Sequence, residues 1–325
     1  MKKILTIIAL AATSCSLHSP VESDSPVPLK TTDITVKVSC PGTRVTEISG
    51  EDEAAVNSLQ VFVFDSDGAI DAVGRGSGGS LSINVTAGKG KRLWAVANAP
   101  DLTDIGREED LCGSISRLTD NAADHLVMAG NTAADINSDM EITINLVRLA
   151  ARLSVKSISR SFSAPALAAR PLVIKGIYLI NVAAGLRLDC SGEVTDWLSR
   201  RGFESSSADE LTSDRGLSIS LGNSETYSTT HSFYCYPNPC TADSVEQDWC
   251  PRKTRLVLEA ELGGDLCYYS LTFPEIRRNC TYTVENLTLS GKGSPTPDTP
   301  YGRDALSASL TVRDWADGSS YTERL

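Results

Sequence analysis

This chain of 325 residues has nine cysteines but only three histidines, so the cysteines are the first candidates for metal or redox chemistry. Three of them, Cys235, Cys240 and Cys250, lie close together with the spacing C-x4-C-x9-C. Structural zinc sites usually draw their ligands from paired CxxC or HxxxH spacings, and only His231 lies near this cluster. We therefore interpret these cysteines as disulfide-bonded or free thiols, and we predict neither a metal nor a cofactor.

The other patterns that could support catalysis are incomplete. The Gly-rich run GRGSGGS at 74–80 lacks the lysine and the following helix of a phosphate loop, so it predicts a hairpin connection. No G-x-S-x-G elbow is present, and DSDG at 65–68 lacks the terminal Glu of a calcium-binding loop. His125 and His231 stand alone. We predict no catalytic residue and no enzymatic activity.

The first cysteine, Cys15, follows a segment typical of exported proteins. Lys2 and Lys3 precede an apolar stretch that ends at Ala12 and is shorter than the about 20 residues that span a bilayer. Small residues directly before a cysteine are typical of bacterial lipoproteins, although Ala12 stands where Leu is more usual. We predict a signal peptide over 1–14 and a lipid on the Cys15 thiol. The alternative is plain secretion with cleavage near Ala12.

The segment after Cys15 is predicted to be a tether. Residues 15–30 are rich in Ser and Pro and show no apolar periodicity. The net charge of −11 disfavours binding to nucleic acid or to anionic lipid. The eight cysteines beyond Cys15 are an even number, which allows disulfides in an oxidising compartment and leaves their pairing open.

Alternation of apolar and polar residues dominates the rest of the chain and predicts β-strands. Ile34, Val36 and Val38 alternate in the first such segment. In LQVFVF, at 59–64, one face carries Leu59, Val61 and Val63 and the other carries two phenylalanines, before the hairpin signal Asp67-Gly68. Further strand-like segments lie at 80–85, 91–100, 141–158, 172–182, 254–262, 266–274, 281–291 and 307–315. Short helices are expected only within 100–127. This pattern predicts an all-β fold of sandwiches.

The length suggests two domains. We expect the boundary near 148–152, where LVRLAARL links two strand-rich halves. The predicted domains are 31–147, whose first strand is 32–39, and 148–325.

Taken in order, these segments resemble the FimA-type fimbrillins, the major subunits of the type V pili of Gram-negative bacteria. The resemblance rests on the lipoprotein signal, the opening strand at 31–39, Arg44 in CPGTRV and the acidic lead into the strand at 59–64. It continues with KRLWAVANAP, LVMAG, LVRLAARLSV, IRRNCTYTVENLTLSGKG, a Pro-rich linker and a last strand before Trp315.

The resemblance implies a fold and a mechanism. It implies two tandem transthyretin-like β-sandwich domains with a C-terminal extended donor segment. It also implies an exported outer-membrane lipoprotein that an arginine-specific surface protease cuts after its first strand. The groove left by that strand is filled by the C-terminal segment of another subunit, so the protein ends in an extracellular fimbrium with copies of itself and other fimbrial subunits as partners.

The residues of this mechanism can be assigned in the present chain. The leaving strand is expected at the edge of its sheet, at about 32–39, with Ile34, Val36 and Val38 facing inward. The cut is expected between Arg44 and Val45, with Arg200-Arg201 and Arg277-Arg278 as alternative basic sites. The donor strand is expected at about 305–315, after a stiff Pro-rich spacer at 291–302, and its residues are Leu306, Ala308, Leu310, Val312 and Trp315.

Other functions stay open at this point. The chain could be a pilus anchor or tip subunit, or a monomeric lipoprotein that binds glycans or proteins at the cell surface. Both terminal strands could also pair simply within their own sheets.

Overall fold

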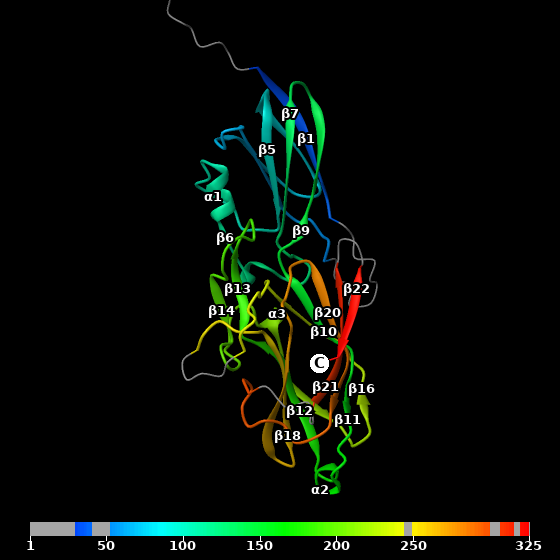
Figure 1. Cartoon of the computed structure of the whole chain (residues 1–325). Coiled ribbons are helices and arrows are strands. Elements are labelled where there is room, and N and C mark those ends of the chain that lie inside the picture. Colours follow the sequence, from blue (N-terminus) through cyan, green and yellow to red (C-terminus); the bar gives the residue numbers. More distant parts are fainter. Residues whose placement is uncertain (1–29, 41–52, 244–248, 300–305, 315–318, 325) are drawn as a thin grey trace, which may run out of the picture.

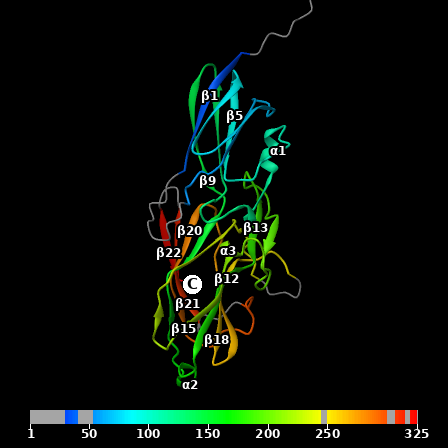
Figure 2. The ribbon, with the colours of Figure 1, turned by 180° about the vertical axis from the view of Figure 1, so that it is seen from behind.

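The computed structural model describes residues 30–40, 53–243, 249–299, 306–314 and 319–324. Figure 1 shows an elongated molecule, with β1, β5 and β7 at one end and the strands of the second half at the other. Seen from behind in Figure 2, β20, β21 and β22 again lie together in the second half. The fold is all-β and built from β-sandwiches, as predicted.

Two sheets form the first half of the chain. One has the order β4-β1-β8. Its strands are β1 (Thr31–Ser39), β4 (Ser80–Thr86) and β8 (Met140–Asn145). The other has the order β3-β2-β5-β7-β9. Its strands are β2 (Leu59–Phe64), β3 (Ile70–Gly76), β5 (Gly88–Ala97), β7 (Met128–Ile136) and β9 (Val147–Arg148).

The two faces of strand β2 pack into two different hydrophobic cores. Leu59, Val61 and Val63 pack into a core shared with β1, β4 and β8, whereas Phe62 and Phe64 belong to a larger core that continues into the second half. The two faces read from the sequence are therefore confirmed. The hairpin after β2 is confirmed too, and Gly68 has a φ of 84°, which favours glycine.

The Gly-rich run at 74–80 does not form the expected hairpin. Strand β3 pairs with β2, whereas β4 pairs with β1, so the run carries the chain from one sheet to the other. The glycine-rich composition indicated a connection between two strands, but the prediction that those strands pair with each other was wrong.

Three sheets contain the strands of the second half. The first, with the order β16-β11-β20-β10-β17, also carries β21 on β20 and β22 on β21. Its strands are β10 (Ala151–Val155), β11 (Ile158–Arg160), β16 (Thr226–Tyr227), β17 (His231–Cys235), β20 (Cys280–Leu289), β21 (Leu306–Asp314) and β22 (Ser320–Arg324). The second has the order β15-β12-β18-β19. Its strands are β12 (Leu172–Ile180), β15 (Ser213–Ser220), β18 (Arg255–Leu262) and β19 (Asp265–Thr272).

The third of these sheets joins the two halves. Strand β6 (Ile115–Arg117), from the first half, pairs with β13 (Val182–Arg187), which also pairs with β14 (Asp196–Leu198). The chain passes from β9 to β10 within LVRLAARL, and the segment 141–158 is divided among β8, β9, β10 and β11 rather than one long strand. The division into domains at 147/148 stays a prediction.

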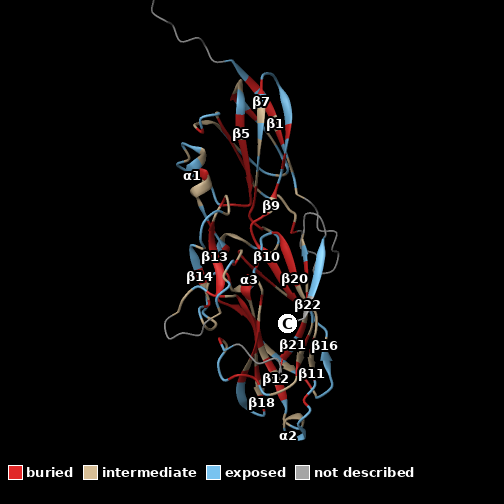
Figure 3. Cartoon of the chain, viewed as in Figure 1, coloured by how far each residue is buried: buried red, intermediate tan, exposed pale blue. Residues whose placement is uncertain are grey.

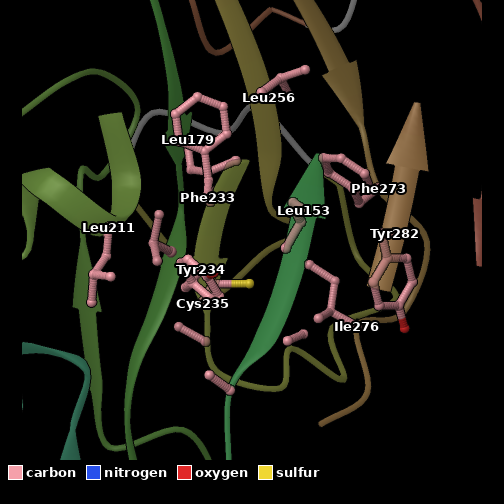
Figure 4. Packing of buried hydrophobic residues seen from close by; sticks show 14 of the residues in the cluster. Leu153, Leu179, Leu211, Phe233, Tyr234, Cys235, Leu256, Phe273, Ile276 and Tyr282 are labelled. Carbon is pink, nitrogen blue, oxygen red and sulfur yellow. The ribbon is translucent and has the colours of Figure 1, made fainter. Parts of the chain in front are cut away.

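The larger core lies mainly in the second half. Figure 4 shows Leu153, Phe233 and Tyr282, from three strands of one sheet, among side chains that include Leu179 and Leu256 of the other sheet. Helices are few and short among the described residues: α1 (Glu108–Gly113), η1 (Leu118–Asp120), α2 (Pro165–Ala168) and α3 (Asp209–Thr212). The first two fall within 100–127, as expected, whereas α2 and α3 lie outside that range, so the expectation of helices only there was wrong. None of the helices in the described ranges combines the length and apolar character needed to cross a membrane.

Candidate assembly site

Strand β1, the predicted leaving strand, is the central strand of its sheet. It pairs in antiparallel fashion with β4 and in parallel with β8, and among the described strands β4 and β8 pair only with β1. The expectation of an edge strand was therefore wrong, because the parallel partner comes from more than 100 residues further along the chain. Removing β1 would separate its two neighbours.

The inward face of β1 contains the residues expected from the alternation. Ile34 and Val36 are 0% exposed and Val38 is half-buried. They share a core with Val61 and Ile142. Thr32 lies on the same face and is also buried. The groove left by β1 would therefore be an apolar slot between two strands, with one polar end.

Asp139, just before β8, holds that polar end. Its Oδ1 accepts hydrogen bonds from the Thr32 hydroxyl at 2.6 Å and from the Asp33 backbone N–H at 3.2 Å. These two bonds lower the pKa of Asp139, because they stabilise its ionised form. Sequence reasoning missed this residue, since nothing near Asp139 in the sequence marks it as a neighbour of β1.

Acid should therefore weaken the hold on β1. A carboxyl whose pKa is lowered in the folded state contributes stability above its ordinary pKa of about 4, and this contribution is lost as the pH falls through the lowered value. In protein nicked between 40 and 53, we expect β1 to dissociate faster as the pH falls below about 4. The release of a fluorescently labelled β1 fragment measures this. The Asp139→Asn variant should release β1 faster at neutral pH and respond less to acid, and an unchanged pH response would contradict the role of Asp139.

The predicted cleavage site follows the other end of β1. Cys40 donates its thiol to Met128 Sδ at 3.3 Å. Arg44 and Val45 lie outside the described residues, as does Cys15, the predicted site of lipid attachment. Of the alternative basic sites, Arg200 stacks over the Trp249 ring at 4.6 Å. The assignment of Arg44 as the cleavage site stays a prediction.

Glu53, nine residues after Arg44, is fixed to the second half of the chain. Its buried carboxylate accepts hydrogen bonds from Arg152 Nη1 at 2.7 Å and the Tyr234 hydroxyl at 2.5 Å. Its backbone carbonyl accepts a hydrogen bond from Arg148 Nε at 2.9 Å. We call these four residues the Glu53 cluster. It ties the segment after Arg44 to β9, β10 and β17, and no local sequence signal pointed to it.

Strand β21 contains the predicted donor residues and lies in its own sheet. It pairs with β20 on one side and with β22 on the other. Leu306, Ala308, Leu310 and Val312 are 6%, 7%, 0% and 1% exposed. Trp315 lies outside the described residues. Figure 3 shows β22 as an exposed strand, and its neighbour β21 alternates buried residues with more exposed ones. The alternation therefore marked the buried face correctly, but the neighbour in this chain is β20.

The other residues considered for chemistry, the cysteines and His231, lie in the body of the fold. The eight cysteines from Cys40 to Cys280 are thiols. His231 is buried, and its Nδ1 lies 2.7 Å from Asp214 Oδ2. Within the described ranges, no group of three or more His, Cys, Asp and Glu side chains could hold a metal ion.

Comparison with known proteins identifies the relatives of this fold. The family model for the major fimbrial subunit protein (FimA) matches residues 32–143. The fimbrilin FimA of Porphyromonas gingivalis W83 is similar in fold, with a TM-score of 0.66 and 14% identity over 87% of this chain and 97% of that one. A candidate cell adhesion protein from Bacteroides eggerthii has a TM-score of 0.64 and 19% identity over 89% of this chain and 97% of that one.

The tip fimbrial protein Mfa3 of P. gingivalis, solved with a C-terminal truncation, has a TM-score of 0.53 and 13% identity over 88% of this chain and 100% of that one. No curated protein sequence matches the chain. These similarities establish the fold over most of the chain, whereas the family match lies in its N-terminal half.

Proposed function

We propose that this chain is a structural subunit of a cell-surface fimbrium and that it polymerises by donor-strand exchange. The match to the FimA family model and the similar fold of the P. gingivalis fimbrilin support the proposal. The observation that carries the proposal is the position of β1. This strand fills an apolar slot between β4 and β8, and the chain that follows it contains Arg44. Loss of β1 would leave two ladders of unpaired backbone groups beside that slot, which a strand from another copy can restore.

The donor in this proposal is β21. Its four inward side chains alternate as those of β1 do, and in the acceptor it would exchange the ladders with β20 and β22 for ladders with β4 and β8. The same side chains are buried before and after, so the strand itself gains little free energy. The free energy that drives the exchange must therefore come from the difference between the site that β21 leaves and the site that it fills.

The opening left by β1 and the opening left by β21 differ in their position within the sheet. Without β1, its sheet has no central strand, and β4 and β8 lose their partner. Without β21 and β22, the sheet from β16 to β17 stays continuous and only the outer edge of β20 opens. The exchange also gives up the ladder between β21 and β22, but β22 is a short, exposed strand, whereas β4 and β8 have no other partner among the described strands, so filling the β1 slot with β21 lowers the free energy once β1 is gone.

The lipid and the protease determine when this begins. In our proposal, Cys15 delivers the precursor to the outer membrane, and an arginine-specific surface protease then cuts between Arg44 and Val45. The cut releases the lipid together with β1, and the subunit becomes part of an extracellular fimbrium. The Glu53 cluster would keep the new N-terminal segment attached to the folded body.

Replacing Arg44 by Ala should block assembly. We expect purified protein treated with an arginine-specific protease to begin at Val45 and to form ladders on gels, because removal of β1 opens the acceptor slot. The Arg44→Ala variant should stay monomeric, and Edman sequencing together with gel mobility measures both results. The Arg200→Ala variant is the control and should assemble normally. Ladders formed by the Arg44→Ala protein would rule out this site.

A tip subunit is the second candidate, because the fold also resembles that of a tip fimbrial protein. The apolar alternation of β21 favours a stalk subunit, which must donate a strand as well as accept one. Immunogold labelling of fimbriae decides between them: labels along the shaft support the stalk, and labels confined to the ends support the tip.

A further inference from the structure

The Pro-rich segment after β20 is fastened to the folded body from Gly291 to Asp298. Its first contact is the Gly291 carbonyl, which accepts the Tyr269 hydroxyl at 3.0 Å. Ser294 and Tyr268 then exchange two backbone hydrogen bonds of 2.8 and 2.9 Å at the edge of β19. The segment expected to be a stiff spacer before the donor strand is therefore held as an added partner of β19.

The glycine at position 293 permits this close approach. A Cβ atom there would lie 2.7 Å from the Tyr268 carbonyl oxygen, closer than real Cβ atoms come to backbone. Further along, the Ser270 hydroxyl donates to the Pro297 carbonyl at 2.5 Å. Three consecutive residues of β19, from Tyr268 to Ser270, thus hold the segment.

Asp298 ends the fastened segment in a buried ion cluster. Its Oδ2 accepts from Arg252 Nη1 at 3.0 Å, and its Oδ1 accepts from Arg255 Nη1 and, at 3.1 Å, from Asn181 Nδ2. Both arginine side chains are 0% exposed, and Arg255 also pairs with Asp243 at 2.5 Å. Moving Asp298 away would leave two buried guanidinium groups without this carboxylate. The loss of a charge partner in the buried interior costs far more free energy than the same loss at the surface.

This cost differs from the cost of moving β21. The acceptor slot offers β21 new ladders and a new apolar face, as argued above. It offers nothing that replaces Asp298 between Arg252 and Arg255. The two neighbouring segments therefore respond differently when the C-terminal strand is exchanged.

We propose that Asp298 is the fixed anchor of the exchanged C-terminal segment, an inference that rests on the proposed function. Residues 290–299 stay on β19 and β18 while β21 crosses to a second copy of the chain. Seven residues lie between Asp298 and Leu306, and a fully extended chain over these eight steps spans at most about 29 Å, so the acceptor slot must begin within roughly that distance of this anchor. The pull between neighbouring subunits is carried through Asp298 into the sheet of β12 and β18.

Two engineered disulfides test which segment moves. Tyr268 and Ser294 form a backbone-paired couple, and so do Thr283 of β20 and Thr311 of β21, and such pairs have the spacing that a disulfide requires. The double variant Tyr268→Cys with Ser294→Cys locks the Pro-rich segment in place. The double variant Thr283→Cys with Thr311→Cys locks β21. Peptide mapping verifies each bond, and each protein is cut at Arg44 and assayed for ladders with and without reductant.

We expect the first lock to leave assembly unchanged and the second to abolish it until reductant is added. Loss of assembly in the oxidised first variant, with recovery on reduction, would overturn the anchor while leaving strand exchange intact. Normal assembly in the oxidised second variant would instead overturn β21 as the donor, and with it the proposed exchange.

A second measurement examines Asp298 itself in the uncut full-length protein. Hydrogen exchange of the Ser294 amide should be at least tenfold faster in the Asp298→Asn variant than in the unaltered protein. The Asp265→Asn variant is the control, because Asp265 contacts Lys292 of the same segment at 3.8 Å from an exposed position, and it should change the rate little. Equal exchange in all three proteins would exclude Asp298 as the anchor. If the Asp298→Asn protein does not fold, the two disulfide variants still decide the proposal.

Discussion

Truncation of the chain after Thr299 is expected to abolish assembly and to lower the free energy of unfolding by several kcal/mol. The deletion removes β21, whose Leu310 and Val312 are almost completely buried against the core of the second half. Each fully buried aliphatic side chain contributes about 1.5–3 kcal/mol. Urea denaturation followed by tryptophan fluorescence measures the loss, and gel ladders after arginine-specific cleavage measure assembly.

The structure also supplies a control for this truncation. Removing only residues 320–325 deletes β22, in which Ser320, Tyr321 and Thr322 are exposed, so stability should change little. Because β21 is retained, the protein that lacks only residues 320–325 should still assemble. If the longer truncation proved as stable as the intact chain, β21 would contribute nothing to its own sheet, contrary to its burial.

Replacing Arg152 by Ala is expected to destabilise the protein by about 3–5 kcal/mol, because the change leaves the Glu53 carboxylate buried without its cation. The ion pair is 2.7 Å long, and its two side chains are 5% and 6% exposed. Chemical denaturation measures the change. Since Glu53 holds the segment after Arg44, the variant should also be cut more readily by a nonspecific protease near residue 53.

Two further variants separate the buried charge from the loss of packing. Replacing both members of the pair, as Glu53→Gln with Arg152→Met, removes both charges and should recover most of the stability. Lys156→Ala breaks a pair with Glu285 whose side chains are 36% and 44% exposed, so its effect should stay below about 1 kcal/mol. An Arg152→Ala protein no less stable than the Lys156→Ala protein would contradict the importance of the Glu53 cluster.

The local alternation of residues was sufficient to predict the strands and their buried faces. Ile34 and Val36 in β1, the two faces of β2, and the four aliphatic residues of β21 all point as their period of two requires. This works because successive side chains of a strand point to opposite faces whatever its neighbours are. The composition also indicated the short helices within 100–127.

Only the tertiary structure decided which strands became neighbours. Strand β1 is central because β8 joins it from a distant part of the chain, and Asp139 meets Thr32 across 107 residues of sequence. Strand β21 lies on β20, and Asp298 reaches Arg252 and Arg255 although the Pro-rich composition around it suggested only a stiff spacer. A period of two specifies a face but not a partner, since pairing depends on the complementary shape and charge of segments far apart in the sequence.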